Sequence, residues 1–155
     1  MGAKLTREGY EKLKKELVYL QTTKRREVID AIAKARAHGD LKENAEYDAA
    51  KNEQAFLEKR VAELDDILAD ATVLDESNMD CSKAYLGATL TLHDIGNDRE
   101  LKYMLVSKEE ASFKDGKISI DSPVGKHLLG KAVGEEVEIT IPAGTLRYKL
   151  LQIER

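Results

Sequence analysis

The residues best suited to chemistry are two carboxylates three positions apart, Asp40 and Glu43. Carboxylate oxygens are the ligands that Mg²⁺ prefers, and residues at this spacing lie on one side of a helical turn. Two acids alone do not make a tight metal site, so we expect them to complete a site that a partner supplies. Glu46 is a third acid, which could join them or could instead be a favourable charge in the first turn of a helix.

The same spacing also has a purely structural explanation. Asp40 could cap a following helix, with Glu43 at the third helical position, which is the spacing of a capping box. Spacing alone favours this interpretation. Leu41 lies where the chain must reverse and has little to pack against, which favours insertion of the segment into another molecule.

The rest of the sequence carries no comparable group of residues. His38, His93 and His127 are isolated, without the spacing of metal ligands. The serines have no histidine at a suggestive spacing, and the glycines do not form a phosphate-binding pattern. The single cysteine, Cys81, cannot form a disulfide within the chain, which suits a reducing cytoplasm. We therefore do not expect an autonomous enzyme.

Two long helical patterns flank the acidic segment. Thr6 is a good N-cap for the first, and no proline occurs from Thr6 to His38, so we expect one continuous α-helix there. Apolar positions recur in steps of three and four, first at Tyr10, Leu13, Leu17, Leu20, Lys24, Val28, Ile32 and Ala35, then at Tyr47, Ala50, Gln54, Leu57, Val61, Leu64, Leu68 and Ala71. If the chain folds back at Leu41, these two series of positions pair in antiparallel register without a shift. The pattern predicts an antiparallel two-helix coiled coil over residues 1–75, with its tip at 39–47.

The composition of the 155 residues agrees with a slender, solvated element, because 35% are charged and only 5% are aromatic. The net charge of -4 argues against a free-standing DNA-binding protein, although contact with nucleic acid inside a larger assembly stays open. Basic residues along both helices suit either a solvated face or a surface that guides a phosphate backbone. No apolar run approaches the ~20 residues of a membrane span, so we expect a cytoplasmic protein.

Helical periodicity stops at a polar linker, residues 76–80. The segment 81–155 then predicts a small antiparallel sheet with one short helix, which makes the whole chain an α+β protein. Ser122 is a good N-cap for that helix, Pro123 suits its first position and Gly130 suits its end. The expected strands are Thr89–Leu92, Leu101–Val106, Ile118–Ile120, Val137–Ile141 and Leu146–Leu150.

Three stretches resemble one known family, the Gre transcript-cleavage factors of bacterial RNA polymerase. The most specific is the tip, Arg36-Ala37-His38-Gly39-Asp40-Leu41-Lys42-Glu43-Asn44-Ala45-Glu46-Tyr47. The other two are Leu5-Thr6-x-x-Gly9 and the run from Ile120-Asp121-Ser122-Pro123 to Leu128-Leu129-Gly130-Lys131. The resemblance covers nearly the whole chain and implies an N-terminal antiparallel coiled coil followed by an FKBP-like domain.

The resemblance implies an accessory factor that activates another protein's catalytic centre. The globular domain would dock at the rim of the polymerase secondary channel, and the coiled coil would reach the active centre. There Asp40 and Glu43 would help to hold a second Mg²⁺ and its water, while the polymerase itself cleaves backtracked RNA. The factor would bind no stable metal of its own and would act as a monomer.

The resemblance also implies roles for further residues. Arg36 and Lys51 would contact the extruded 3′ end of the nascent RNA, a weaker match than the tip. The residues that would support the tip are Gly39, Leu41, Asn44, Glu46 and Tyr47. The segment that would dock on the polymerase consists of Asp121, Ser122 and Pro123. The acidic tip pattern is intact, whereas homologous anti-cleavage factors carry a different tip, so cleavage stimulation is favoured.

Two other functions stay open at this stage. The chain could bind the secondary channel and modulate or inhibit polymerase without donating metal ligands, or it could be a coiled-coil adaptor unrelated to transcription. An FKBP-like fold could also suggest prolyl isomerase activity. With no Trp and only two Phe, we expect the aromatic pocket for that activity to be absent.

Overall fold

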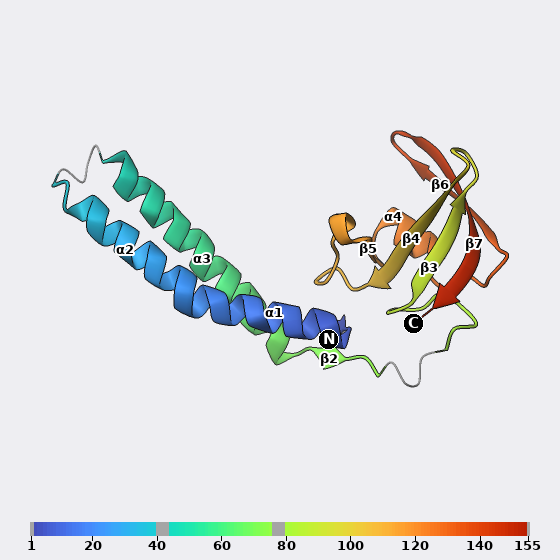
Figure 1. The fold of residues 1–155 in the computed structure, drawn as a ribbon, viewed down its shortest axis with the longest axis horizontal. Coiled ribbons are helices and arrows are strands. Elements are labelled where there is room, and N and C mark those ends of the chain that lie inside the picture. The colour runs from blue at the N-terminus through green and yellow to red at the C-terminus, as the bar shows by residue number, and fades with distance from the viewer. Residues whose placement is uncertain (1, 40–43, 76–79, 155) are drawn as a thin grey trace. The chain divides into compact units, whose positions relative to one another are not determined.

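The computed structural model describes residues 2–39, 44–75 and 80–154. Contacts divide the chain into two units (Figure 1). We call Tyr10–Asp70 the arm, and we call Met1–Gly9 together with Ala71–Arg155 the globular unit. The domain boundaries expected from the sequence stay predictions, and residues 76–79 of the expected linker lie outside the described residues.

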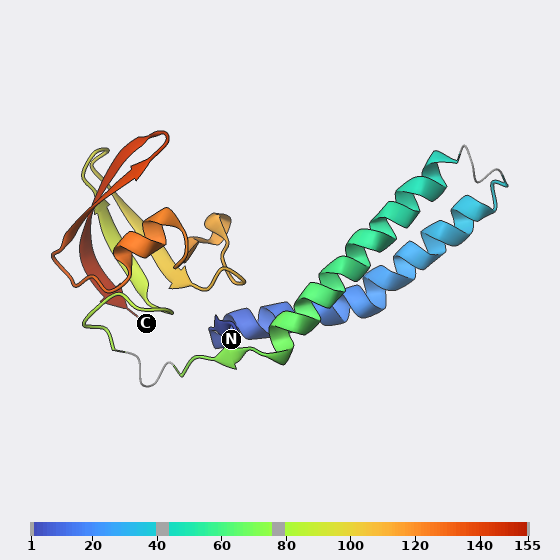
Figure 2. The ribbon, with the colours of Figure 1, turned by 180° about the vertical axis from the view of Figure 1, so that it is seen from behind.

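The arm is a helical hairpin, as the paired seams predict. Its first half consists of α1 (Arg7–Tyr19), a π-helix η1 (Leu20–Lys24) and α2 (Arg25–Arg36), and α1 begins within the globular unit. Its second half is α3 (Ala45–Ala69), which runs beside α2 in both views (Figures 1 and 2). Among the described helices, none is long and apolar enough to cross a membrane.

A buried apolar seam holds the two halves of the arm together. Val28, Leu57 and Val61 form its cluster, with Leu17, Leu20 and Ile32 packed against them. Ion pairs flank the seam between the halves, Lys24–Glu53 at 2.6 Å, Arg25–Glu58 at 3.0 Å and Arg60–Glu16 at 2.9 Å. Exposed pairs of this kind contribute roughly 0–1 kcal/mol each, so burial of the seam is the main stabilising term.

The π-helix corrects the expectation of one continuous α-helix. Between Leu20 and Val28 the seam of the first half advances by eight residues, whereas between Gln54 and Val61 the second half advances by seven. The wider turn of a π-helix absorbs one extra residue and returns the following apolar residues to the seam. The hydroxyl of Thr22 donates to the carbonyl of Val18 at 2.7 Å, beside this wider turn.

The globular unit contains a five-stranded sheet in the order β5-β4-β3-β7-β6. The strands are β3 (Thr89–Asp94), β4 (Arg99–Val106), β5 (Lys117–Ser119), β6 (Glu136–Ile141) and β7 (Gly144–Glu154). All neighbouring pairs are antiparallel except β4 and β5, which are parallel. The expected fully antiparallel sheet is therefore wrong at this edge, because a turn and the short 3₁₀-helix η3 (Phe113–Asp115) return the chain in the direction of β4.

The short helix α4 (Pro123–Leu128) lies against one face of the sheet, in contact with β6 (Figure 2). Ser122 caps it and Pro123 occupies its first turn, as predicted. Gly125 is required there, because a Cβ atom on it would lie 2.0 Å from the carbonyl oxygen of Ser119. Leu128 anchors the helix in the core of the sheet.

A second, two-stranded sheet was not expected from the sequence. β1 (Lys4–Leu5) pairs in parallel with β2 (Thr72–Val73). Leu5 is fully buried, and its carbonyl accepts from the N–H of Leu74 at 2.8 Å. The pair joins the segments through which the chain enters and leaves the arm.

The turn between β3 and β4 is organised by the buried carboxylate of Asp94, which is only 2% exposed. Its Oδ2 accepts from the Asn97 side chain at 3.0 Å, and Nε of Arg99 lies 3.3 Å away. These donors, the Asn97 amide first, hold the pKa of Asp94 below its usual value although burial acts in the opposite direction. Asp98 takes a left-handed conformation with φ of 48°, which Asp tolerates better than most residues.

The extra residue in the first half of the arm can be tested by deletion. Deleting Thr22 should replace the π-helix with an α-turn and leave the thermal midpoint of the arm equal or higher. Deleting the exposed Asp30 should instead rotate the following apolar residues out of the seam and cost roughly 2–4 kcal/mol of unfolding free energy. Circular dichroism melting measures both, and equal losses for the two deletions would contradict the skip-residue explanation.

The depressed pKa of Asp94 gives a prediction about pH. Because the folded-state pKa is the lower one, the carboxylate stabilises the fold above the unfolded pKa of about 3.9 and loses that effect as the pH falls through the folded value. Asp94→Asn should therefore lower the unfolding midpoint at pH 7, and the difference from the unchanged protein should shrink as the pH falls below about 4. A difference that is constant from pH 7 to pH 3 would contradict this assignment.

Candidate functional site

The first half of the arm ends in a well-defined helix terminus. The N–H groups of Ala37, His38 and Gly39 donate to the carbonyls of Ala33, Ala35 and Arg36 at 3.1–3.2 Å. Gly39 has φ of +92°, a left-handed conformation that ends helices and that glycine adopts without strain. Support of the tip by Gly39 thus has a physical basis in the backbone.

Asn44 begins the second half and bonds to both halves. Its Oδ1 accepts from the N–H of Tyr47 at 3.1 Å, which makes Asn44 the N-cap of α3. Its Nδ2 donates to the carbonyl of Ala35 in the last turn of α2 at 2.6 Å. One side chain therefore caps one helix and joins it to the end of the other.

This arrangement corrects the capping interpretation of the acids. Spacing favoured Asp40 as the cap of the second helix, but α3 begins at Ala45 and its cap is Asn44. Sequence reasoning preferred the acid because its partner three residues on completes a familiar motif, whereas Asn is an equally good N-cap. Asp40, Leu41 and Glu43 themselves lie outside the described residues.

The third acid of the motif has a partner in the structure. Oε2 of Glu46 lies 3.0 Å from Nε2 of His38, an ion pair when the imidazole is protonated. Glu46 is also in the first turn of α3, where a negative charge is favourable. Its structural role is thus sufficient to explain its position.

The two predicted RNA-contacting residues come from opposite halves of the arm and lie together. Arg36 of α2 and Lys51 of α3 line one groove of about 410 Å³, with Ile29 and Ile32 among its apolar residues. Nζ of Lys51 is 3.1 Å from the amide oxygen of Gln54. The groove offers two cations beside exposed aliphatic surface, a combination suited to a phosphate-bearing chain.

A metal centre within the described ranges is not indicated. Residues 2–39, 44–75 and 80–154 contain no group of three His, Cys, Asp or Glu side chains arranged to hold an ion. The predicted ligands, Asp40 and Glu43, stand outside those ranges.

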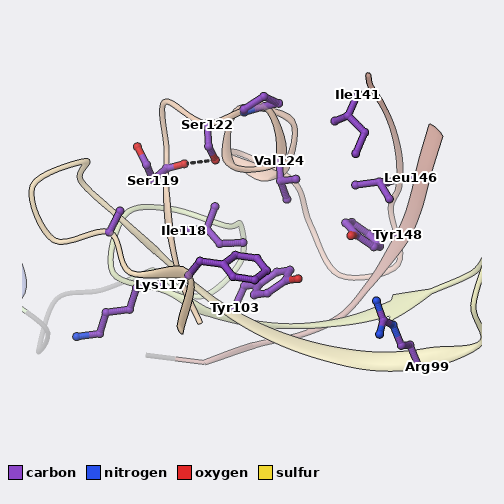
Figure 3. A pocket seen from close by; sticks show the side chains of 13 residues that line it. Arg99, Tyr103, Lys117, Ile118, Ser119, Ser122, Val124, Ile141, Leu146 and Tyr148 are labelled. Atoms are coloured by element: carbon purple, nitrogen blue, oxygen red, sulfur yellow. Dashed lines mark hydrogen bonds between the residues drawn. The ribbon is translucent and has the colours of Figure 1, made fainter. Parts of the chain in front are cut away.

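The predicted docking segment lies at the edge of a cavity in the globular unit. The N–H of Asp121, an exposed residue, donates to Oγ of Ser119 at 3.0 Å. The hydroxyl of Ser122 donates to the carbonyl of Ser119 at 2.6 Å (Figure 3). Ser122 and Pro123 both line the cavity, which has a volume of about 520 Å³. The predicted docking segment is therefore a hydrogen-bonded turn beside an open cavity.

The cavity is mainly apolar and partly aromatic. Tyr103 and Tyr148 point their hydroxyls into it, and the Arg99 side chain lies near Tyr148 (Figure 3). Burial, followed by the neighbouring Tyr103 and Asp94, raises the pKa of Tyr148, so its hydroxyl stays a hydrogen-bond donor. The remaining walls come from Ala111, Phe113, Lys117, Ile118, Ser119, Val124, Ile141 and Leu146.

The expected absence of a prolyl isomerase pocket stays a prediction, but the low count of Trp and Phe did not predict this partly aromatic cavity. Counting Trp and Phe missed it because two of its three aromatic residues, Tyr103 and Tyr148, are tyrosines. A usable signal was present in the alternation of strand residues, since Tyr103 on β4 and Leu146 and Tyr148 on β7 follow a period of two toward one face. Sequence reasoning had assigned these residues only to strands.

Comparisons with known proteins match transcription elongation factors along nearly the whole chain. The family model for the N-terminal part of transcription elongation factors matches residues 3–73, and the model for the C-terminal part of GreA/GreB factors matches residues 79–155. Transcription elongation factor GreA of Chloroherpeton thalassium is 51% identical over 150 residues, 97% of this chain and 95% of that protein. The corresponding protein of Chlorobium phaeobacteroides is 50% identical over 96% of this chain and 94% of its own.

One solved structure that resembles the chain is that of GreA factor homolog 1 from Thermus thermophilus. It is 30% identical, covers 100% of both chains and superposes with a TM-score of 0.47. The two family models together span both units, and identity near one half extends over almost the full length of the relatives. The chain therefore belongs to the GreA/GreB family of transcription elongation factors.

Proposed function

We propose that this elongation factor stimulates the Mg²⁺-dependent cleavage of backtracked RNA by RNA polymerase. The observation that carries the proposal is the cap of α3. Because Asn44 caps that helix, neither Asp40 nor Glu43 is needed as its cap, and both stand in the sequence between the two halves of the arm. The proposal places the factor in the cytoplasm, as a monomer bound to polymerase.

The chemistry of the two acids fits their proposed role. Carboxylates are preferred Mg²⁺ ligands, and two of them fall short of a full coordination shell, so they suit a site that the polymerase completes. A second Mg²⁺ supplies an activated water and stabilises the charge of an in-line displacement. In the sequence both acids stand between Gly39, which follows the end of α2 in a left-handed conformation, and Asn44, which caps α3.

The basic groove supports an RNA substrate for the same reaction. Arg36 is the last residue of α2 and Lys51 lies in the second turn of α3, so both cations are close in sequence to the acids. We propose that they hold phosphates of the extruded RNA, which would orient its 3′ segment toward the acids. Attraction to phosphate weakens as salt rises, so this contribution should be largest at low ionic strength.

The cavity beside Ser122 and Pro123 is the proposed docking site for the polymerase. An apolar pocket with hydroxyl donors can accept an apolar side chain of a partner and pair with its backbone carbonyls. The turn that holds Ser122 is fixed by its bond to Ser119, which lowers the ordering cost of docking. Asp121 remains exposed for a polar contact at the rim.

Removing one tip charge should abolish the activity while sparing the fold. We expect Asp40→Asn to reduce RNA cleavage by a stalled, backtracked polymerase roughly 10–100-fold or more, because a neutral amide is a much weaker Mg²⁺ ligand. The matched control is Glu46→Gln, which removes an acid already paired with His38 and should retain most of the cleavage. The RNA fragments on a denaturing gel give the rates.

Asp40→Asn also separates this proposal from the alternative, in which the factor modulates polymerase without donating metal ligands. If Asp40→Asn binds polymerase and cleaves at the normal rate, the factor acts on the channel without donating metal ligands. If the protein does not bind polymerase at all, the arm serves another partner.

A charge in the cavity should weaken docking. Leu146→Asp places a carboxylate in the apolar wall and should weaken binding to polymerase at least about tenfold. Leu151→Asp makes the same change on the same strand, at an exposed residue that does not line the cavity, and should bind normally. Fluorescence anisotropy with labelled factor measures both affinities, and equal binding by the two folded variants would exclude the cavity as the docking site.

A further inference from the structure

Glu110 is a buried carboxylate that no role above explains. It lies in the turn after β4, and the residue is only 8% exposed. Its Oε2 accepts from the backbone N–H of Thr6 at 3.1 Å, and its Oε1 accepts from the Thr6 hydroxyl. Nζ of Lys117 lies 3.7 Å from Oε1. Burial of a carboxylate is costly without such partners, so the Thr6 donors and the Lys117 ammonium group stabilise Glu110 in this buried position.

The Thr6 segment is built to receive that carboxylate. Thr6 is 2% exposed, and its Oγ1 accepts from the N–H of Gly9 at 3.0 Å, which closes the first turn of α1. A Cβ atom on Gly9 would lie 2.2 Å from Cδ of Glu110, and the three atoms nearest to it all belong to that carboxyl group. Gly9 is thus required because Glu110 occupies the space of its side chain.

The contact between Glu110 and Thr6 lies close to the point where the chain enters the arm. Residues 1–9 belong to the globular unit, and the chain passes into the arm between Gly9 and Tyr10. The β1–β2 pair and the Glu110 contact hold this segment to the rest of the globular unit. Lys117 also lines the docking cavity, although its ammonium group points away from it (Figure 3).

We propose that Glu110 is a positioning residue for the arm, because it locks the first turn of α1 onto the globular unit. This role rests on the proposed function: a unit docked on polymerase can deliver the tip acids reproducibly only if the root of the arm is held. The motif Leu5-Thr6-x-x-Gly9 is then the receptor for one carboxylate. Loss of the lock should lower the maximal cleavage rate while leaving the concentration of factor needed for half-maximal cleavage unchanged.

The decisive test uses the full-length protein alone and combines two substitutions. Gly9→Ala in the unchanged protein should lower the thermal midpoint, because the new methyl group collides with Glu110. In a Glu110→Ala background the collision is gone, and Gly9→Ala should raise the midpoint, since Ala is the better helix former. The same effect of Gly9→Ala in both backgrounds would overturn the proposal.

Amide exchange supplies a direct readout of the lock. The Thr6 amide should exchange roughly tenfold to a hundredfold faster in Glu110→Ala, and Glu110→Gln, which keeps one acceptor oxygen, should restore part of the protection. Glu109→Ala, a neighbouring control, should leave the Thr6 amide unchanged. Equal exchange in the Glu110→Ala variant and the unchanged protein would refute the lock, whereas absent cleavage by the unchanged protein would refute only the proposed function.

Discussion

The Asn44 side chain holds the two halves of the arm together at the end where the helices part. It satisfies a free N–H at the start of α3 and also donates to a carbonyl in the last turn of α2. Helix ends carry unpaired backbone groups, and one amide offers both the acceptor and the donor needed here. Asn44 thus performs the capping task that the sequence spacing had favoured for Asp40.

The remainder of the arm keeps that end in place. The buried seam around Val28, Leu57 and Val61 supplies the cohesion, and the π-helix absorbs the residue that would otherwise turn later apolar side chains out of the seam. Within the globular unit, the Glu110 carboxylate accepts from Thr6, and β1 pairs with β2.

The sequence predicted the features that depend on local periodicity and capping. The paired three-and-four steps gave the hairpin, and Ser122 and Pro123 gave the start of α4. Contacts between distant residues were not predictable in the same way. The parallel pairing of β5 with β4 and the contact of Glu110 with Thr6 depend on how the chain folds back, for which a single sequence carries no periodic signal.

The candidate site, too, was predicted from the sequence only in part. Arg36 and Lys51 were named from a family resemblance, and the structure brings them into one groove. The tyrosine-lined cavity was missed because the aromatic count considered residue types without their strand positions. Asp40 was preferred as a cap because its spacing to Glu43 matches a capping box, and the observed start of α3 at Ala45 decides for Asn44.

We propose that Asp40 and Glu43 supply Mg²⁺ ligands to the polymerase centre. The most direct measurement is the Mg²⁺ dependence of RNA cleavage in a backtracked complex saturated with factor. We expect the unchanged factor to lower the Mg²⁺ concentration for half-maximal cleavage, and Glu43→Gln to shift that concentration back toward the value without factor. An identical Mg²⁺ dependence for Glu43→Gln and the unchanged factor would contradict it.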